Sequence, residues 1–181
     1  MAKSAITTYG EALFQIAVES SSLESMLKEV GELKDVLVAN GELGELMSNP
    51  RFSKEEHLEI LSNVFKGKID EKLYLFLELL VNKGRYDNVI DILDYFTLRV
   101  KEHQGIGHAV VTSAVKIDEE TKKLIKGKLL STTEYRAIEI DYIVDSSLIG
   151  GMVIRIKDRI VDNSVKTKLD LISRDLHKIK V

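Results

Sequence analysis

The sequence predicts a mainly α-helical protein with a smaller α/β part, in which a six-helix bundle precedes a small α/β domain. Three observations favour this fold class. Apolar residues recur every three or four positions from Ala2 to about Gln104, the spacing of amphipathic helices. Runs of β-branched residues with period-two alternation follow. With 181 residues, 44% of them hydrophobic and one proline, the chain can bury one large core or two small ones.

Six helices are expected before Gly105, and residues that start or end helices explain where they break. Pro50 ends one helix because the residue before a proline is pushed out of the α region. Ser53, followed three residues later by Glu56, forms a capping box that starts the next helix. Asp70 caps the fifth helix, and Gly84 suits its C-terminal end. The predicted helices are Lys3–Glu19, Leu23–Ala39, Glu42–Ser48, Lys54–Phe65, Glu71–Lys83 and Asp87–His103.

The pattern changes near His103–Gly107, where two glycines allow a hinge. We therefore predict domains 1–104 and 105–181. In the second domain, alternation indicates strands and a final apolar stripe of Val165, Leu169, Ile172 and Leu176 indicates a helix. The predicted elements are strands Ala109–Thr112, Ala137–Val144, Gly151–Lys157 and Arg159–Val161, and helices Asp118–Leu130 and Ser164–Lys178.

Composition excludes several classes of function. The chain has no cysteine, which rules out disulfide frameworks, thiolate metal sites and cysteine nucleophiles. No apolar run approaches the ~20 residues that span a bilayer, so we expect no direct membrane insertion. Residues 1–104 carry 12 Lys and Arg against 18 Asp and Glu, a net charge of −6, whereas residues 105–181 carry 14 against 11, a net charge of +3. This asymmetry predicts two partners of different character, and no nucleic acid.

The residues able to carry chemistry have structural interpretations. Gly150-Gly151 lacks the lysine and hydroxyl that a phosphate loop needs, so it is interpreted as a turn that only glycine fits. The four histidines lie too far apart along the chain for a zinc site. Acidic pairs such as Glu55-Glu56 complement the dipole at helix starts. The sequence predicts no catalytic, cofactor-binding or metal-binding residues, and a protein that is not an enzyme.

Lysines on the predicted helix after Asp118 have two interpretations. A solvated helix face is one, and a patch for an acidic partner is the other. The lysines are Lys122, Lys123, Lys126 and Lys128. A helix–glycine–helix segment from Phe65 to Asp70 resembles a DNA-reading motif, but its acidic surroundings argue against that function.

The first helix has two apolar rows where one would suffice for a core contact. The first row is Ile6, Gly10, Leu13 and Ala17, and the second is Ala2, Ala5, Tyr9, Ala12 and Ile16. Either the helix is buried all round in the bundle, or the second row forms a small-residue groove that receives a partner's helix. The sequence leaves both possibilities open.

Five segments carry recognisable motifs: Tyr9–Phe14, Asn49-Pro50, Leu79–Arg85, Val111–Ala114 and Val144–Leu169. In order and spacing, these motifs resemble the delta subunit family of rotary F-type ATP synthases, called the oligomycin-sensitivity-conferring protein in mitochondria. The resemblance runs through essentially the whole chain, and its most specific part is the C-terminal block. Gly10 stands where the family usually has alanine, Ser146 where proline is common, and Asn163 in place of the usual Asp-Gly-Ser turn.

The resemblance implies a non-catalytic peripheral-stalk, or stator, subunit that links the catalytic head to the membrane sector and resists rotor torque. It implies that domain 1–104 binds N-terminal helices of the alpha subunits through its first and fifth helices, and that domain 105–181 binds the C-terminal region of the b subunits. The residues we assign to the alpha contact are Ala5, Tyr9, Ala12, Ile16, Leu75 and Leu79. Those assigned to the stalk contact are Gly150, Gly151, Asp162, Ser164 and Leu169.

On this interpretation the chain is a monomer within a hetero-oligomeric complex. It lies at the cytoplasmic face of a bacterial plasma membrane, since the chain starts at Met1 without a transit-peptide pattern. The alternative is a generic cytoplasmic helical adaptor unrelated to ATP synthase. RNA binding by the basic second part is a further alternative, but only Tyr135 and Tyr142 supply aromatic rings there.

Overall fold

The computed structural model describes residues 2–49 and 51–179. The chain separates into two units, Met1–Val100 and Lys101–Val181. The division falls slightly before the boundary predicted at Gln104, within the last turns of helix α6 (Val89–His103).

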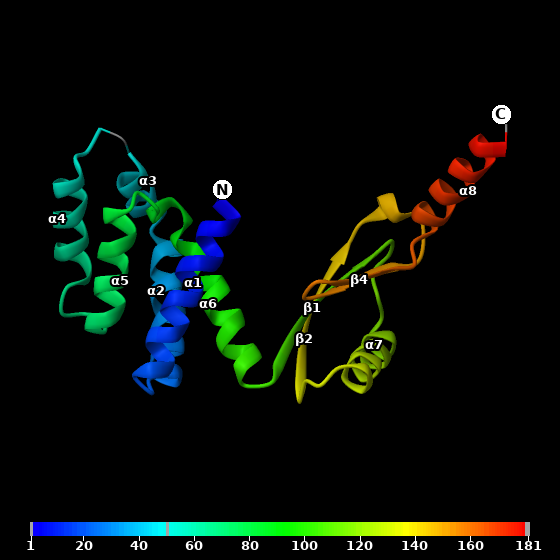
Figure 1. Ribbon diagram of the computed structural model, residues 1–181, viewed down its shortest axis with the longest axis horizontal. Coiled ribbons are helices and arrows are strands. Elements are labelled where there is room, and N and C mark those ends of the chain that lie inside the picture. The colour runs from blue at the N-terminus through cyan, green and yellow to red at the C-terminus, as the bar shows by residue number, and fades with distance from the viewer. Residues whose placement is uncertain (1, 50, 180–181) are drawn as a thin grey trace. The chain divides into compact units, whose positions relative to one another are not determined.

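Helices form the described part of the first unit (Figure 1). They are α1 (Ala2–Glu19), α2 (Leu23–Ala39), α3 (Gly41–Ser48), α4 (Lys54–Phe65), α5 (Glu71–Asn82), a 3-10 turn η1 (Tyr86–Asn88) and α6. The mainly helical fold class is thus confirmed. The last helix begins later than predicted because η1 occupies its expected first turn. Pro50, predicted to end α3, lies outside the described residues.

The predicted helix caps are present. Ser53 Oγ accepts from the Glu56 backbone N–H at 3.2 Å, and the Glu56 carboxylate accepts from the Ser53 N–H at 2.6 Å, which completes the capping box. The Asp70 carboxylate accepts from the Lys72 N–H at 2.8 Å. Gly84 has φ +61°, the left-handed conformation expected just after a helix. Caps of this kind each stabilise a helix by about 1 kcal/mol.

The first apolar row of α1 enters the core of the first unit. Gly10, Leu13 and Ala17 are buried. Gly10 lies against α6, where a β-carbon would come within 2.3 Å of the Tyr95 ring. This contact explains the glycine at this position, because the ring occupies the space that a methyl group would need. The largest fully buried side chains of this core are Leu13, Val30, Leu61, Leu73, Leu77, Leu80, Ile92, Leu93, Phe96 and Val100.

The second unit contains a four-stranded sheet in the order β2-β1-β3-β4. Strand β1 pairs parallel with β2 and antiparallel with β3, and β3 pairs antiparallel with β4. The parallel pair is joined through α7, as such crossovers require. The elements are β1 (Ile106–Ser113), α7 (Glu119–Thr132), β2 (Ala137–Val144), a 3-10 turn η2 (Ser146–Leu148), β3 (Met152–Ile156), β4 (Arg159–Asp162) and α8 (Val165–Ile179).

Strand β1 begins earlier than predicted, and this changes the role of its glycine. Gly107, expected in a hinge, is a buried residue of β1 paired with Ile138. A β-carbon there would meet the Tyr135 ring at 2.4 Å. Gly107 is therefore fixed by strand pairing and close packing instead of providing a flexible joint.

The second unit has a small core and two uncovered elements. The buried apolar side chains described in it are Ala109, Val111, Ile125 and Ile138. Every residue of β4 is exposed, and its outer edge has no neighbouring strand in the sheet. Figure 1 shows α8 leading away from the sheet beyond η2, not lying across it.

Candidate helix-docking surfaces

The second apolar row of α1 stays at the surface. Ala12 and Ile16 are exposed, and Ala5 and Tyr9 are half-buried. Ala2 belongs to the same row, but its side chain lies outside the described ones. Helix α1 is therefore not buried all round within its unit. Its free row combines small side chains with one aromatic ring, a surface to which another helix can approach closely.

Helix α5 also keeps apolar side chains at the surface. Leu75 is 53% exposed and Leu79 is 40% exposed, while Leu73, Leu77 and Leu80 are fully buried. The main packing partners of α5 are α4 and η1, whereas α1 packs on α2 and, through Gly10, on α6. The structure thus exposes the predicted residues of α1 and α5 but does not present these helices as principal packing partners.

An ion pair ties α1 to α6 beside the exposed row. The Glu11 carboxylate accepts from Arg99 Nε at 2.8 Å and Nη2 at 3.2 Å. The hydrogen bond from Arg99 is the main cause that lowers the pKa of Glu11 below 4.5. The Arg99 guanidinium also lies 5.1 Å from the centre of the Phe14 ring. No local pattern in the sequence indicates this pair, since its members are 88 positions apart.

The glycine pair makes the turn predicted from the sequence. Gly151 has φ +74°, and a β-carbon on it would lie 2.3 Å from the carbonyl oxygen of Asn163. A β-carbon on Gly150 would lie 2.9 Å from Val165 Cγ2. The Gly150 carbonyl accepts from the Val165 N–H at 2.9 Å, which joins the turn to the start of α8. The residue before the pair, Ile149, has φ +67°, which is strained for a β-branched residue.

Asp162 and Ser164 fix the start of α8. The Asp162 carboxylate accepts from the Ser164 N–H and from the Thr167 hydroxyl, both at 2.8 Å. The hydrogen bond from the Ser164 backbone is the main cause that lowers the pKa of Asp162. Ser164 is buried, and its Oγ accepts from the Thr167 N–H at 3.2 Å. Both residues therefore have structural roles that orient α8.

Helix α8 presents an unpartnered apolar face in its described part. Leu169 is 51% exposed, and Val165 and Ile172 are also exposed. Leu171 is a further exposed apolar residue that the predicted stripe did not include. The side chain of Leu176, the last member of the stripe, lies outside the described side chains. Polar residues occupy most other described positions, so α8 is strongly amphipathic.

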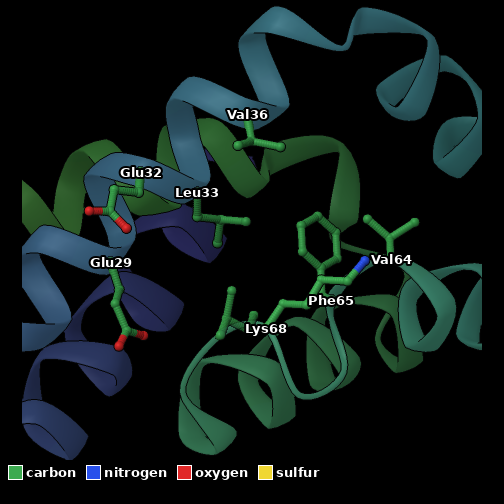
Figure 2. A pocket seen from close by; sticks show the side chains of 8 residues that line it. Glu29, Glu32, Leu33, Val36, Val64, Phe65 and Lys68 are labelled. Atoms are coloured by element: carbon green, nitrogen blue, oxygen red, sulfur yellow. The ribbon is translucent and has the colours of Figure 1, made fainter.

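A groove of about 440 Å³ lies between α2 and the end of α4. Figure 2 shows Glu29 and Glu32 on the α2 side and Lys68 on the other, with Leu33 and Phe65 between them. Glu29 accepts from the Asp70 N–H at 3.0 Å, so it already supports the start of α5. No local pattern in the sequence indicates this groove, because its two walls come from distant segments.

The lysines of α7 border a shallow cleft against β2. Lys122 pairs with Glu119 at 2.6 Å and lies 5.2 Å from the centre of the Tyr142 ring. Lys123 and Lys126 also line the cleft. Lys122 thus contacts its own helix and the sheet. For the other three lysines, both interpretations stay open: a solvated helix face, or a patch that binds an acidic partner.

The described residues offer little chemistry. They contain no group of three or more His, Asp or Glu side chains able to hold a metal ion. Burial raises the pKa of Tyr86 to about 12, so its hydroxyl stays protonated and does not act as a base. Within the same residues, no helix combines the length and the apolar character needed to cross a membrane.

Exposed apolar rows on helices of both units are typical of a class of protein that packs against other chains in an assembly. Residues 6–176 match the family described as ATP synthase delta (OSCP) subunit. ATP synthase subunit delta of Lachnoclostridium phytofermentans is 46% identical over 181 residues, the full length of both chains. That of Bacillus cereus is 35% identical over 170 residues, 94% of each chain, and that of Prochlorococcus marinus is 32% identical over 175 residues, 97% of each chain.

Structural comparison agrees on the fold. A chain of the Toxoplasma gondii mitochondrial ATP synthase hexamer, solved by cryo-EM, superposes with a TM-score of 0.74 at 18% identity, covering 94% of this chain and 96% of that one. This chain therefore belongs to the ATP synthase delta (OSCP) subunit family. It is a non-catalytic, peripheral-stalk subunit of an F-type ATP synthase, and the alternative of an unrelated adaptor is not supported.

Proposed function

We propose that the two units hold opposite ends of the stator. The first unit, as a six-helix bundle, binds N-terminal helices of the alpha subunits, and the second binds the C-terminal region of the b subunits. The chain acts as a monomer in the complex, at the cytoplasmic face of a bacterial plasma membrane. Held at both ends, it keeps the catalytic head from turning with the rotor, so that proton flow drives ATP synthesis.

The exposed second row of α1 is the observation that carries this proposal. Ala12 and Ile16 remain uncovered within their unit although they are apolar. A static link needs large contacts that dissociate slowly, and small side chains let two helix backbones approach closely. We assign the alpha contact to a surface formed by Ala5, Tyr9, Ala12, Ile16, Leu75 and Leu79.

The stalk contact is assigned to the turn and helix at the end of the second unit. Gly150 and Gly151 shape the turn, and Asp162 and Ser164 fix the start of α8. Leu169 then presents an apolar side chain to the b subunits. The first four residues would position the surface, and Leu169 would contact the partner.

Calorimetric titration with an alpha-subunit N-terminal peptide tests the head contact. Ala12→Asp should weaken binding by about 3 kcal/mol or more, because it buries an uncompensated carboxylate at the contact. Tyr9→Ala should weaken it by about 2 kcal/mol through loss of an aromatic anchor. Val38→Asp, at an exposed position of α2, is the matched control and should leave binding unchanged. Wild-type affinity in Ala12→Asp would show that this face is not the site.

A further inference from the structure

Helix α6 crosses the division between the two units without interruption. Its middle turns supply Ile92, Phe96 and Val100 to the core of the first unit. Its last turn, from Lys101 to His103, belongs to the second unit. The covalent connection at the division is therefore helical. Any force transmitted through α6 would act on the contacts that hold this last turn.

Glu102 in that last turn is held by two groups of the second unit. Its carboxylate accepts from the Tyr135 hydroxyl at 3.2 Å and is ion-paired with Lys157. The Lys157 ammonium also lies 5.7 Å from the centre of the Tyr135 ring. The Glu102 side chain is only 22% exposed, so its interactions are better shielded from solvent than those of a surface ion pair.

Lys157 adopts a backbone conformation that indicates constraint. It lies in the tight turn between β3 and β4 with φ +51°, a left-handed conformation that non-glycine residues adopt rarely. Such strain persists only where the surroundings hold the residue in place. The two-residue hairpin between β3 and β4 requires this conformation, and the contacts of the Lys157 side chain with Glu102 and the Tyr135 ring further restrain the residue.

Neighbouring contacts fix the rest of the same turn of α6 and the residues after it. Lys101 pairs with Glu139 of β2 at 2.7 Å. The Arg136 guanidinium donates to the carbonyl of Gln104, and the Arg136 N–H donates to the carbonyl of Gly105 at 2.8 Å. The segment after α6 is thus bonded to the second unit residue by residue.

We propose that Glu102, Tyr135 and Lys157 form a clamp, which fixes the end of α6 to the stalk-binding unit so that this turn can carry mechanical force. These are positioning residues: they contact neither partner and keep the turn of α6 from unwinding under tension. The proposal rests on the proposed function for the load, but the clamp itself is a property of the free protein.

Hydrogen exchange on the full-length protein tests the clamp without any partner. Glu102→Gln and Lys157→Gln should each speed amide exchange at residues 101–104 by about tenfold, while α1 and α5 stay protected. Glu32→Gln is the control, because Glu32 forms an exposed ion pair with Lys28 on α2. Unchanged exchange at residues 101–104 in both variants would overturn the proposal.

A charge swap distinguishes the effect of losing the ion pair from that of a general loss of structure. Glu102→Lys combined with Lys157→Glu restores opposite charges at the two positions and should recover most of the protection that either single reversal loses. Equal loss in the single and double variants would show that pairing between these residues is not what holds the turn.

Activity assays on the assembled synthase test whether the clamp carries mechanical force. Enzyme carrying Glu102→Gln and Lys157→Gln should keep ATP hydrolysis and lose several-fold in proton-driven ATP synthesis, with alpha-peptide and b-fragment binding unchanged. An unchanged rate of ATP synthesis would overturn the proposal that the clamp carries mechanical force. If the unmodified chain bound neither fragment, the proposed function would fail, while the exchange result would still decide whether the clamp exists.

Discussion

At the scale of single residues, Gly151 shows how backbone and neighbours together determine a residue type. Its positive φ disfavours any side chain, and the Asn163 carbonyl occupies the position of a β-carbon. The two constraints act together, because the positive φ also sets where a β-carbon would point. The glycine was identified from the sequence, but the carbonyl that it accommodates was not.

Gly151→Val should therefore destabilise the second unit by more than about 1 kcal/mol, as glycine replacements at incompatible positions do. Urea unfolding of the full-length chain measures the change. Gly127→Ala is the matched control: it lies within α7 with no atom near its β-carbon position, so it should stabilise by about 0.5–1 kcal/mol.

The same Gly151→Val variant tests the assignment of partners to units. Pull-down by b-subunit fragments should fall, while pull-down by alpha-subunit fragments should persist. Loss of the alpha contact with retention of the b contact would invert the assignment.

Glu11 gives the first unit a predictable dependence on pH. Its pKa in the folded protein is lowered by the hydrogen bond from Arg99, so the stabilisation is present above the unfolded pKa near 4.5 and is lost as the pH falls below it. Both side chains are about a third exposed, which limits the contribution to about 0.5–1 kcal/mol.

Glu11→Gln should cost about that amount at pH 7 and much less at pH 3.5. Urea unfolding at the two pH values checks this. A cost that stays constant with pH would mean that packing, and not the charge, determines the effect.

At the scale of elements, α8 exposes an apolar face that its own unit does not use. Leu169→Asp should abolish capture by b-subunit fragments and leave the thermal unfolding of the free chain unchanged, because Leu169 contributes little to the described core. Leu124→Asp on α7 is the control, since Leu124 is even more exposed, at 69%. Equal loss of capture in both variants would indicate a nonspecific effect of charge.

Element boundaries were predictable where local chemistry sets them. The capping box at Ser53 and the cap at Asp70 depend on residues two or three positions away, so the sequence contains the whole interaction. The role of Gly107 was not predictable in the same way. The Tyr135 ring and the partner strand β2 fix it, and both lie far along the chain.

The exposed apolar surfaces were predictable only in part. Two apolar rows on the first helix signalled a surplus of apolar surface, but the sequence could not distinguish burial on all sides from an exposed row. That distinction depends on which helices α1 packs against. The groove of Figure 2 and the Glu102 clamp each join segments that are far apart in the sequence, so no local pattern indicates them.

At the scale of the whole molecule, the core residues of the first unit lie within its own helices, from Leu13 to Val100. Residues 1–104 should therefore fold alone with a cooperative transition. A disordered amide spectrum from that fragment would contradict the boundary. Residues 105–181 should be less stable, since ~75 residues supply only a marginal core and the fragment also lacks Glu102.

Strand β4 has a consequence for the chain before it joins the complex. Its outer edge offers unpaired backbone groups, with the exposed apolar residues Ile160 and Val161 between two charges. Edges of this kind invite pairing between copies, and flanking charges such as Arg159 and Asp162 oppose it. The short length of β4 and these two charges therefore protect chains that have not yet joined the complex from pairing along this edge.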